Sequence, residues 1–282
     1  MKSILFCFIF LLAWVGMCSA APPARIISLA PNVTEVVCAL GLERNLVGVT
    51  TFCDYPASVR GKATVGGPAH PSLEAVLSLN PDVVVLDEEG IGPSLSGRLA
   101  RLGIRTALFH GSRLAGLPDG IRRLGRDLGA PVQGELLAAR IERSLRAAER
   151  KRTMPRALFI IWPDPLVTAG TGTVIDNALR LAGFRNIAAD TRGSYPRISL
   201  EAVTERNPEI LVVGPGHAHD FPMGKLLRRL ASVDAVRAGR ICYVSDALYR
   251  SGPRIPKGIG ELRRCADRFF PNQALQRKGS GP

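Results

Sequence analysis

Short apolar runs alternate with amphipathic segments along most of the chain, and this alternation predicts the secondary structure. Arg25-Ile-Ile-Ser-Leu29 is a β-type run, followed by a loop at 30–32 and a helix at 33–40 that ends at Gly41. The same alternation predicts further strands at 47–49, 83–86, 106–109, 157–161, 210–214 and 241–244, and helices at 72–79, 95–101, 119–128, 173–181, 225–230 and 256–269. Strands that alternate with helices form parallel sheets covered on both faces, so the predicted fold class is α/β.

Residues 131–152 break this alternation. Apolar residues recur there at helical spacing between arginines and glutamates: Val132, Leu136, Leu137, Ile141, Leu145 and Ala148. We therefore expect one long amphipathic helix, which at 1.5 Å per residue spans about 33 Å.

An internal repeat flanks this helix. Ser72-Leu-Glu-Ala-Val76, three further residues and Asn80-Pro-Asp-Val-Val-Val85 recur as Ser199-Leu-Glu-Ala-Val203, three further residues and Asn207-Pro-Glu-Ile-Leu-Val212. In each copy a serine N-cap opens a helix, and Asn-Pro ends it before a buried strand. The repeat predicts two similar Rossmann-like lobes with parallel sheets, joined by one long backbone helix. The expected boundaries are 21–130 for the N-terminal lobe, 131–152 for the connecting helix, 153–272 for the C-terminal lobe and 273–282 for a frayed tail.

The first twenty residues have the pattern of a secretory signal peptide. Lys2 precedes an apolar run over 4–15, and Cys18-Ser-Ala20 supplies the small residues that signal peptidase requires. Lipid attachment at Cys18 is the alternative, but Met17 is a poor residue before a lipidated cysteine. We expect cleavage after Ala20 and a periplasmic protein.

The composition is unusual only in its net charge. The 282 residues carry 37 Lys and Arg against 24 Asp and Glu, a net charge of +13 within an otherwise ordinary globular composition. Such an excess suggests anionic partners, but export argues against nucleic acid. Helical arginines such as Arg140, Arg143 and Arg146 are typical of a solvated face.

Four cysteines remain after the signal peptide: Cys38, Cys53, Cys242 and Cys265. An oxidising compartment favours one or two disulfides over free thiols, and three connectivities are possible.

Two lobes joined by a stiff helix predict a ligand clamp with its cleft at the carboxyl ends of the strands. Several segments resemble the periplasmic cobalamin-binding proteins, which are ABC-transporter receptors of the helical-backbone, siderophore-type class. The resemblance runs from about Arg25 to Phe270, and it is carried by 25–35, Val47-Gly-Val49, Asp54-Tyr-Pro56, the two Ser-Leu-Glu segments, Ser245-Asp246, Arg250 and Pro253-Arg-Ile255.

This resemblance implies a set of site residues. Glu74 and Glu201 match the paired glutamates that dock onto arginines of the permease dimer. Tyr55, Trp162 and Tyr195 match aromatic residues placed against the corrin ring, and Asp246 and Arg250 match polar residues of the cleft rim. Asn32, in the loop after the first strand, completes the expected ligand-binding set.

The chain also departs from the resembled family. Tryptophans are missing near 66–69 and after the third strand, where Asp87-Glu88-Glu89 stands instead, so we expect a more acidic cleft wall. The family's disulfide joins the last helix to the helix near Ala182. Cys265 fits one end and Ala182 does not fit the other, so any pairing here must differ.

Two other chemistries have candidate residues in the sequence. His70, His110 and the pair His217 and His219, together with Asp87 or Glu88, could bind zinc or haem iron, but their spacing matches no tight chelate. Gly170-Thr-Gly-Thr-Val-Ile175 resembles a dinucleotide fingerprint without its third glycine, and no phosphate loop or nucleophile elbow occurs, so an exported enzyme is disfavoured.

The sequence therefore predicts a non-catalytic, cofactor-free and monomeric periplasmic solute-binding protein. It would capture cobalamin or a related corrinoid and deliver it to an ABC permease dimer. Haem, a ferric siderophore or a metal ion is the alternative ligand.

Overall fold

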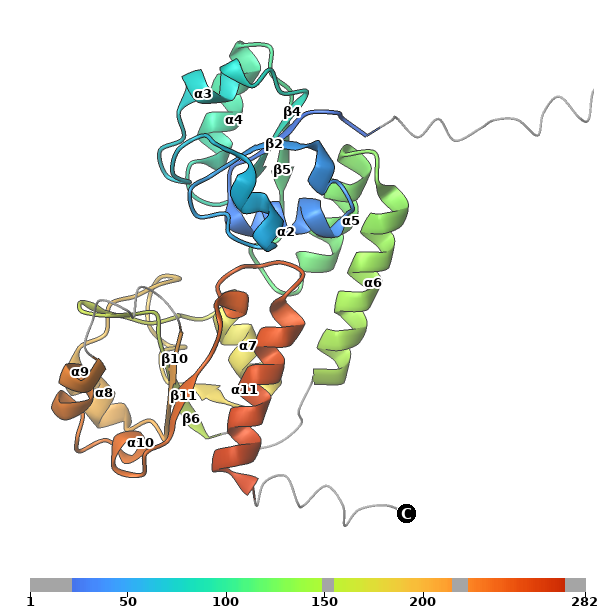
Figure 1. The fold of residues 1–282 in the computed structure, drawn as a ribbon. Helices are drawn as coiled ribbons and strands as arrows, with labels where there is room; N and C mark the ends of the chain where they lie inside the picture. The colour runs from blue at the N-terminus through green and yellow to red at the C-terminus, as the bar shows by residue number, and fades with distance from the viewer. Residues whose placement is uncertain (1–21, 149–154, 215–222, 272–282) are drawn as a thin grey trace, which may run out of the picture.

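The computed structural model describes residues 22–148, 155–214 and 223–271, and these residues form two lobes, one above the other in Figure 1. Each lobe is built on a sheet of parallel strands with helices packed against it. The predicted α/β class with two parallel-sheet lobes is confirmed.

Lobe one contains a five-stranded sheet in the order β3-β2-β1-β4-β5. Its elements are β1 (Ile26–Ser28), α2 (Pro31–Ala39), η1 (Glu43–Asn45), β2 (Leu46–Val49), η2 (Ala57–Gly61), β3 (Ala63–Thr64), α3 (Leu73–Ser78), β4 (Val83–Asp87), α4 (Gly92–Arg101), β5 (Thr106–Phe109) and α5 (Leu117–Asp127).

Lobe two contains a four-stranded sheet in the order β11-β10-β6-β9 and a small antiparallel hairpin, β7-β8. Its elements are β6 (Arg156–Ile160), β7 (Trp162–Pro163), β8 (Leu166–Val167), α7 (Val174–Ala182), β9 (Arg185–Asn186), α8 (Leu200–Arg206), β10 (Ile210–Val213), α9 (Met223–Arg229), α10 (Asp234–Arg237), β11 (Ile241–Tyr243), η3 (Asp246–Leu248) and α11 (Ile255–Phe269).

The long helix α6 covers Pro131–Ala148 and packs against α5, α7 and α11. Leu137, Ala138 and Ile141 form its buried stripe, whereas Val132 and Leu136 are 64% and 66% exposed. The expected apolar face was therefore wrong at these two positions, because the helix contacts its neighbours along a narrower stripe than the sequence pattern indicated. Residues 149–152 of the predicted helix and all of the predicted tail lie outside the described residues.

A single hydrophobic cluster continues through both lobes. It includes Val85 and Phe109 of lobe one, Phe159 and Val212 of lobe two, and Ile141 of α6 between them. The central strands β1, β4, β6 and β10 are almost entirely buried, as expected for parallel strands covered on both faces. The strand ends that carry the cleft residues are thus fixed by the packed core.

The sequence repeat is also a structural repeat. Ser72 Oγ accepts a hydrogen bond from the backbone N–H of Ala75 at 3.2 Å, and Ser199 Oγ accepts one from Ala202 at 3.2 Å. Asn80 and Asn207 both adopt positive φ, of 43° and 41°, a conformation that asparagine tolerates better than most residues. The same asparagine conformation therefore leads from helix to strand in both copies, before β4 and β10.

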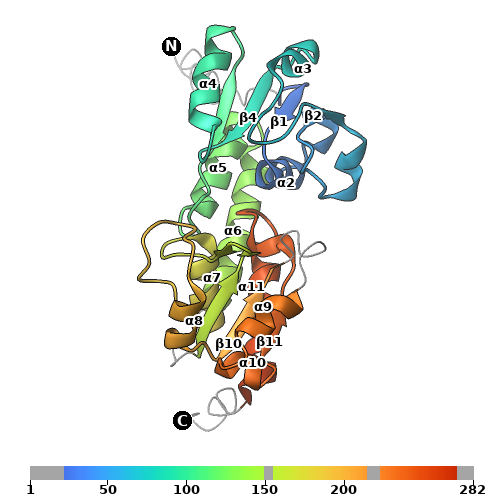
Figure 2. The same cartoon turned by 90° about the vertical axis from the view of Figure 1, so that its left-hand side faces the viewer.

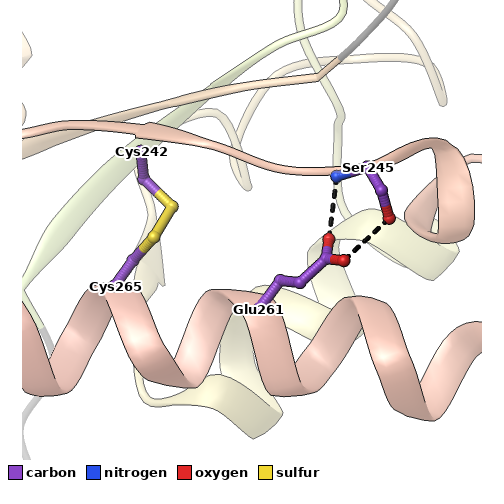
Figure 3. Close-up of a disulfide and its surroundings, with 4 residues drawn as sticks. All are labelled: Cys242, Ser245, Glu261 and Cys265. Carbon is purple, nitrogen blue, oxygen red and sulfur yellow. Dashed lines mark hydrogen bonds between the residues drawn. A yellow bond between two sulfur atoms is a disulfide. The ribbon is translucent and has the colours of Figure 1, made fainter.

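One disulfide joins Cys242 of β11 to Cys265 of α11 (Figure 3). Cys38 and Cys53 are free thiols. Just beyond this bridge, the backbone N–H and Oγ of Ser245 donate to the Glu261 carboxylate at 2.8 and 2.9 Å. Together these contacts fix the segment after β11 against α11. Burial raises the pKa of the Cys38 thiol to about 12, so it remains protonated.

Several expected boundaries were wrong by a few residues. α2 begins at Pro31, which was expected in a loop, because proline is favoured in the first turn of a helix. The short elements β3, β9 and α10 and the β7-β8 hairpin were not predicted. Among the described residues, no helix combines the length and apolar character needed to span a membrane.

Candidate ligand-binding cleft

A pocket of about 370 Å³ lies between the lobes. In lobe one its lining residues end β4 or follow β1, β4 and β5, and in lobe two they follow β6, β9 and β11 or open α7. The lining residues are Pro31, Asn32, Asp87, Glu89, Ser112, Ile161, Val174, Ile175, Tyr195, Leu248, Tyr249, Arg250 and Ser251. This arrangement agrees with the prediction that the cleft lies at the carboxyl ends of the strands.

Asn32 and Asp87 meet where the strand order of lobe one changes direction, between β1 and β4. Asn32 Nδ2 donates to Asp87 Oδ2, and the backbone N–H of Glu89 donates to Asp87 Oδ1 at 2.9 Å. Burial raises the pKa of Asp87 despite these hydrogen bonds. Burial and the neighbouring charge of Asp87 also raise the pKa of Glu89. Two carboxyl groups therefore form the lobe-one wall, as the missing tryptophans predicted.

Tyr195 approaches this acidic wall from lobe two. Its side chain is half-exposed, and it lines the same pocket as Asp87 and Glu89. Partial burial, followed by the charges of Glu89 and Asp87, raises the pKa of its phenol. The phenol therefore stays neutral and can donate a hydrogen bond into the cleft.

Glu88 does not line the pocket, and its hydrogen bonds organise the loop after β5. Its Oε1 accepts hydrogen bonds from the backbone N–H and Oγ of Ser112 at 2.9 and 2.6 Å, and its Oε2 lies 2.8 Å from His110 Nδ1. Burial opposes the charge of Glu88, but the hydrogen bonds from Ser112 and His110 lower its pKa. An ionised Glu88 therefore holds Ser112 at the pocket.

Arg250 is the one cationic side chain among the described residues that line this pocket. Its guanidinium is already paired with three carboxylates: Asp54 at 2.5 Å, Glu35 at 3.2 Å and Asp246 at 3.4 Å. Burial alone would lower the pKa of Arg250, but these neighbours raise it. Its positive charge is thus largely neutralised within the protein.

Tyr249 forms an aromatic part of the lobe-two wall. Its ring packs edge-to-face on Phe159, with 5.7 Å between centroids. A side chain at Gly214 would overlap the Tyr249 hydroxyl, so the glycine at the end of β10 is required for the tyrosine to reach the cleft.

A second pocket of about 400 Å³ adjoins the first and shares Asp87 and Glu89 with it. The rest of its lining is mostly apolar and includes Leu86, Ile91 and Leu95. A ligand larger than the first pocket can extend over the acidic wall into the second.

The structure brings together three of the six expected ligand-binding residues: Asn32, Tyr195 and Arg250. Tyr55 lies instead over Arg254, with 4.2 Å between the guanidinium carbon and the ring centroid. Trp162 is in β7, where its indole N–H donates to the carbonyl of Asp164 at 2.8 Å. Asp246 is paired with Arg254 and does not line the pocket. Ligand contact by any of these residues stays a prediction.

Sequence reasoning missed Ser112, Ile161, Ile175, Tyr249 and Ser251. Each ends or follows a predicted strand or opens a predicted helix, so the position of these residues along the predicted elements was the available signal. It also missed Glu35, whose signal was a lone carboxylate within the apolar run of α2.

Glu74 and Glu201 are exposed and occupy equivalent positions in α3 and α8. The two helices lie in different lobes, both on the side of the molecule opposite α6 (Figure 1). Hydrogen bonds from the first turn of α8, including that with Ser199, lower the pKa of Glu201.

Among the described residues, no group of three or more His, Cys, Asp and Glu side chains is arranged to hold a metal ion. His110 is engaged with Glu88, while His217 and His219 lie outside the described residues.

Comparison with known proteins places the chain in a family. Residues 26–248 match the periplasmic binding protein family. The chain is 30% identical to the vitamin B12-binding protein of Pectobacterium atrosepticum over 208 residues, which cover 70% of this chain and 75% of that protein.

Two solved structures share the fold over nearly their whole length. The periplasmic vitamin B12 binding protein BtuF of Vibrio cholerae superposes with a TM-score of 0.77 at 25% identity, covering 88% of this chain and 98% of that one. The periplasmic heme-binding protein RhuT of Roseiflexus sp. RS-1 superposes with a TM-score of 0.76 at 30% identity, covering 86% and 98%.

Proposed function

The chain belongs to the periplasmic binding protein family, and we propose that it captures a corrinoid between its lobes and delivers it to an ABC permease dimer. Cleavage of the signal peptide after Ala20 would release it as a monomer into the periplasm. The family consists of binding proteins rather than enzymes, and the cleft residues act by recognition alone.

The acidic wall is the observation that favours a corrinoid. A corrin ring carries peripheral amides, whose N–H groups can donate to the carboxylates of Asp87 and Glu89. Haem instead carries two carboxylates, which these side chains would repel. The one arginine of the described lining is already neutralised by Glu35, Asp54 and Asp246. A cleft of this charge selects against an anionic ligand.

Haem remains a second candidate because one relative of similar fold and 30% identity is a heme-binding protein. Tyr195 also lines the pocket with a half-exposed side chain, and a tyrosine oxygen can ligate haem iron. The acidic wall weighs against this candidate.

Calorimetric titration of the purified protein with cobinamide, cobalamin and haem tests the proposal. We expect saturable binding of a corrinoid, with haem at least about tenfold weaker, a difference of 1.4 kcal/mol. Binding of haem with no heat or thermal shift from either corrinoid would reject the corrinoid assignment. Asp87→Asn is expected to weaken corrinoid binding about tenfold, because a hydrogen bond to a charged group is lost.

A further inference from the structure

Five charged side chains meet where lobe two reaches α2 of lobe one. Glu35 and Asp54 come from lobe one, and Asp246, Arg250 and Arg254 come from the segment between β11 and α11. In both views this segment rises from lobe two toward α2 (Figures 1 and 2). We call these five residues the inter-lobe clasp.

Glu35 is the centre of the clasp and its side chain is only 1% exposed. Arg254 Nε donates to Oε2 at 2.8 Å, and Arg254 Nη2 donates to Oε1 at 2.5 Å. Arg250 Nη1 also donates to Oε1 at 3.2 Å. Both carboxylate oxygens of a lobe-one helix are therefore satisfied by donors from lobe two.

The lobe-two arginines are in turn held by their own segment. Arg254 donates to both Asp246 oxygens, at 2.7 and 2.8 Å, in a bidentate pair. This contact is the main cause of the lowered pKa of Asp246. Tyr55 covers the outer face of the Arg254 guanidinium. The Arg254 guanidinium is planar, and its contacts on two edges and one face leave it little freedom to move if the other lobe shifts.

The base of the segment is equally fixed. The Cys242–Cys265 disulfide and the hydrogen bonds between Ser245 and Glu261 attach it to α11 immediately before Asp246 (Figure 3). Between the two arginines, Ser251 Oγ donates to the Gly111 carbonyl of lobe one. The clasp thus joins a rigid part of one lobe to a helix of the other.

From these contacts we propose that Glu35 is a positioning residue, which locks Arg250 and Arg254 across the lobe interface and thereby sets the width of the cleft in the ligand-free protein. A buried carboxylate with two arginine partners favours one arrangement, because a small shift between the lobes would break its ion pairs before water can replace them. Arg250 belongs both to the clasp and to the pocket lining, so the lock places one cleft wall directly.

Hydrogen exchange of the ligand-free protein tests the clasp. Glu35→Gln is expected to speed amide exchange at least about tenfold, equivalent to 1.36 kcal/mol, in α2 and in 246–255. The radius of gyration from small-angle scattering should rise. Glu135→Gln is the matched control: Glu135 of α6 also makes a bidentate pair with an arginine, Arg122 of α5, at 2.9 and 3.1 Å, but its side chain is exposed and it is not part of the clasp.

Arg254→Lys is the second variant, because it keeps the charge but loses both bidentate pairs. It should loosen the same two segments, and it decides the question if Glu35→Gln does not fold. Exchange unchanged from wild type in these segments, or raised equally in every peptide, would overturn the clasp. No ligand is added, so the outcome does not depend on whether the protein binds a corrinoid.

Discussion

At the scale of single residues, the cleft contains carboxylates whose burial disfavours their charged form. Asp87 is the clearest case, because burial raises its pKa although Asn32 and the Glu89 backbone donate to it. A carboxylate kept partly desolvated costs folding free energy but accepts hydrogen bonds from a ligand more strongly than an exposed one. Burial of the Asp87 carboxylate therefore lowers the stability of the fold while it strengthens ligand recognition.

The burial of Asp87 predicts the pH dependence of stability. The folded state binds the Asp87 proton more tightly than the unfolded state, so stability at neutral pH is reduced by this group and recovered as the pH falls through the raised pKa. We expect the melting temperature of wild type to rise relative to Asp87→Asn as the pH is lowered from 7 toward 4.5. Asp119→Asn, at an exposed carboxylate of α5, serves as the control. A constant or opposite difference would contradict this account of Asp87.

At the scale of elements, the segment from β11 to α11 carries the arginines of the clasp and is held at its base by the disulfide. The disulfide closes a loop with a sequence separation of 23, which corresponds to about 3 kcal/mol in the chain-entropy account. The double variant Cys242→Ser, Cys265→Ser should lose about 2–4 kcal/mol in urea unfolding. Cys38→Ser, which removes a free thiol, should lose much less. Equal losses in both proteins would show that the bridge adds nothing to the segment.

The sequence predicted those elements whose pattern is local. β4 and β10 are apolar runs preceded by Asn-Pro, and both were predicted together with the helices before them. A strand that is buried on both faces consists of consecutive apolar residues, so the sequence alone reveals it. The β7-β8 hairpin was missed because Trp162-Pro163-Asp164-Pro165 has neither alternation nor a typical hairpin turn. β3 and β9 contain two residues each, too few for any periodicity.

The site residues, like the elements, include some that the sequence predicted and some that it missed. Asn32 and Arg250 were found through resemblance, and the acidic wall through the missing tryptophans. Glu35 was not found: a lone carboxylate in an apolar run indicates a buried charge but does not identify its partners, which are 215 and 219 residues away. Long-range charge pairing is visible only once the lobes are placed together.

At the scale of the whole molecule, the pseudo-symmetry of the two lobes matters more than the net positive charge. The repeat presents one exposed glutamate per lobe, at equivalent positions in α3 and α8 and on the same side of the molecule. A permease dimer is two-fold symmetric, so two matching carboxylates can engage two matching sites. The clasp fixes the lobes relative to one another, and therefore also fixes the spacing of these two glutamates.

Charge reversal at both positions separates delivery from capture. Glu74→Lys with Glu201→Lys is expected to abolish corrinoid uptake in the presence of the permease, because like charges would face each other at both contacts, while affinity for the free ligand stays at the wild-type value. Glu205→Lys, an exposed glutamate at the other end of α8, is the matched control and should transport normally. Each single reversal should give an intermediate loss, since the other lobe still docks. Uptake that survives the double reversal would reject the docking role, and a parallel loss of ligand affinity would place the effect in the cleft instead.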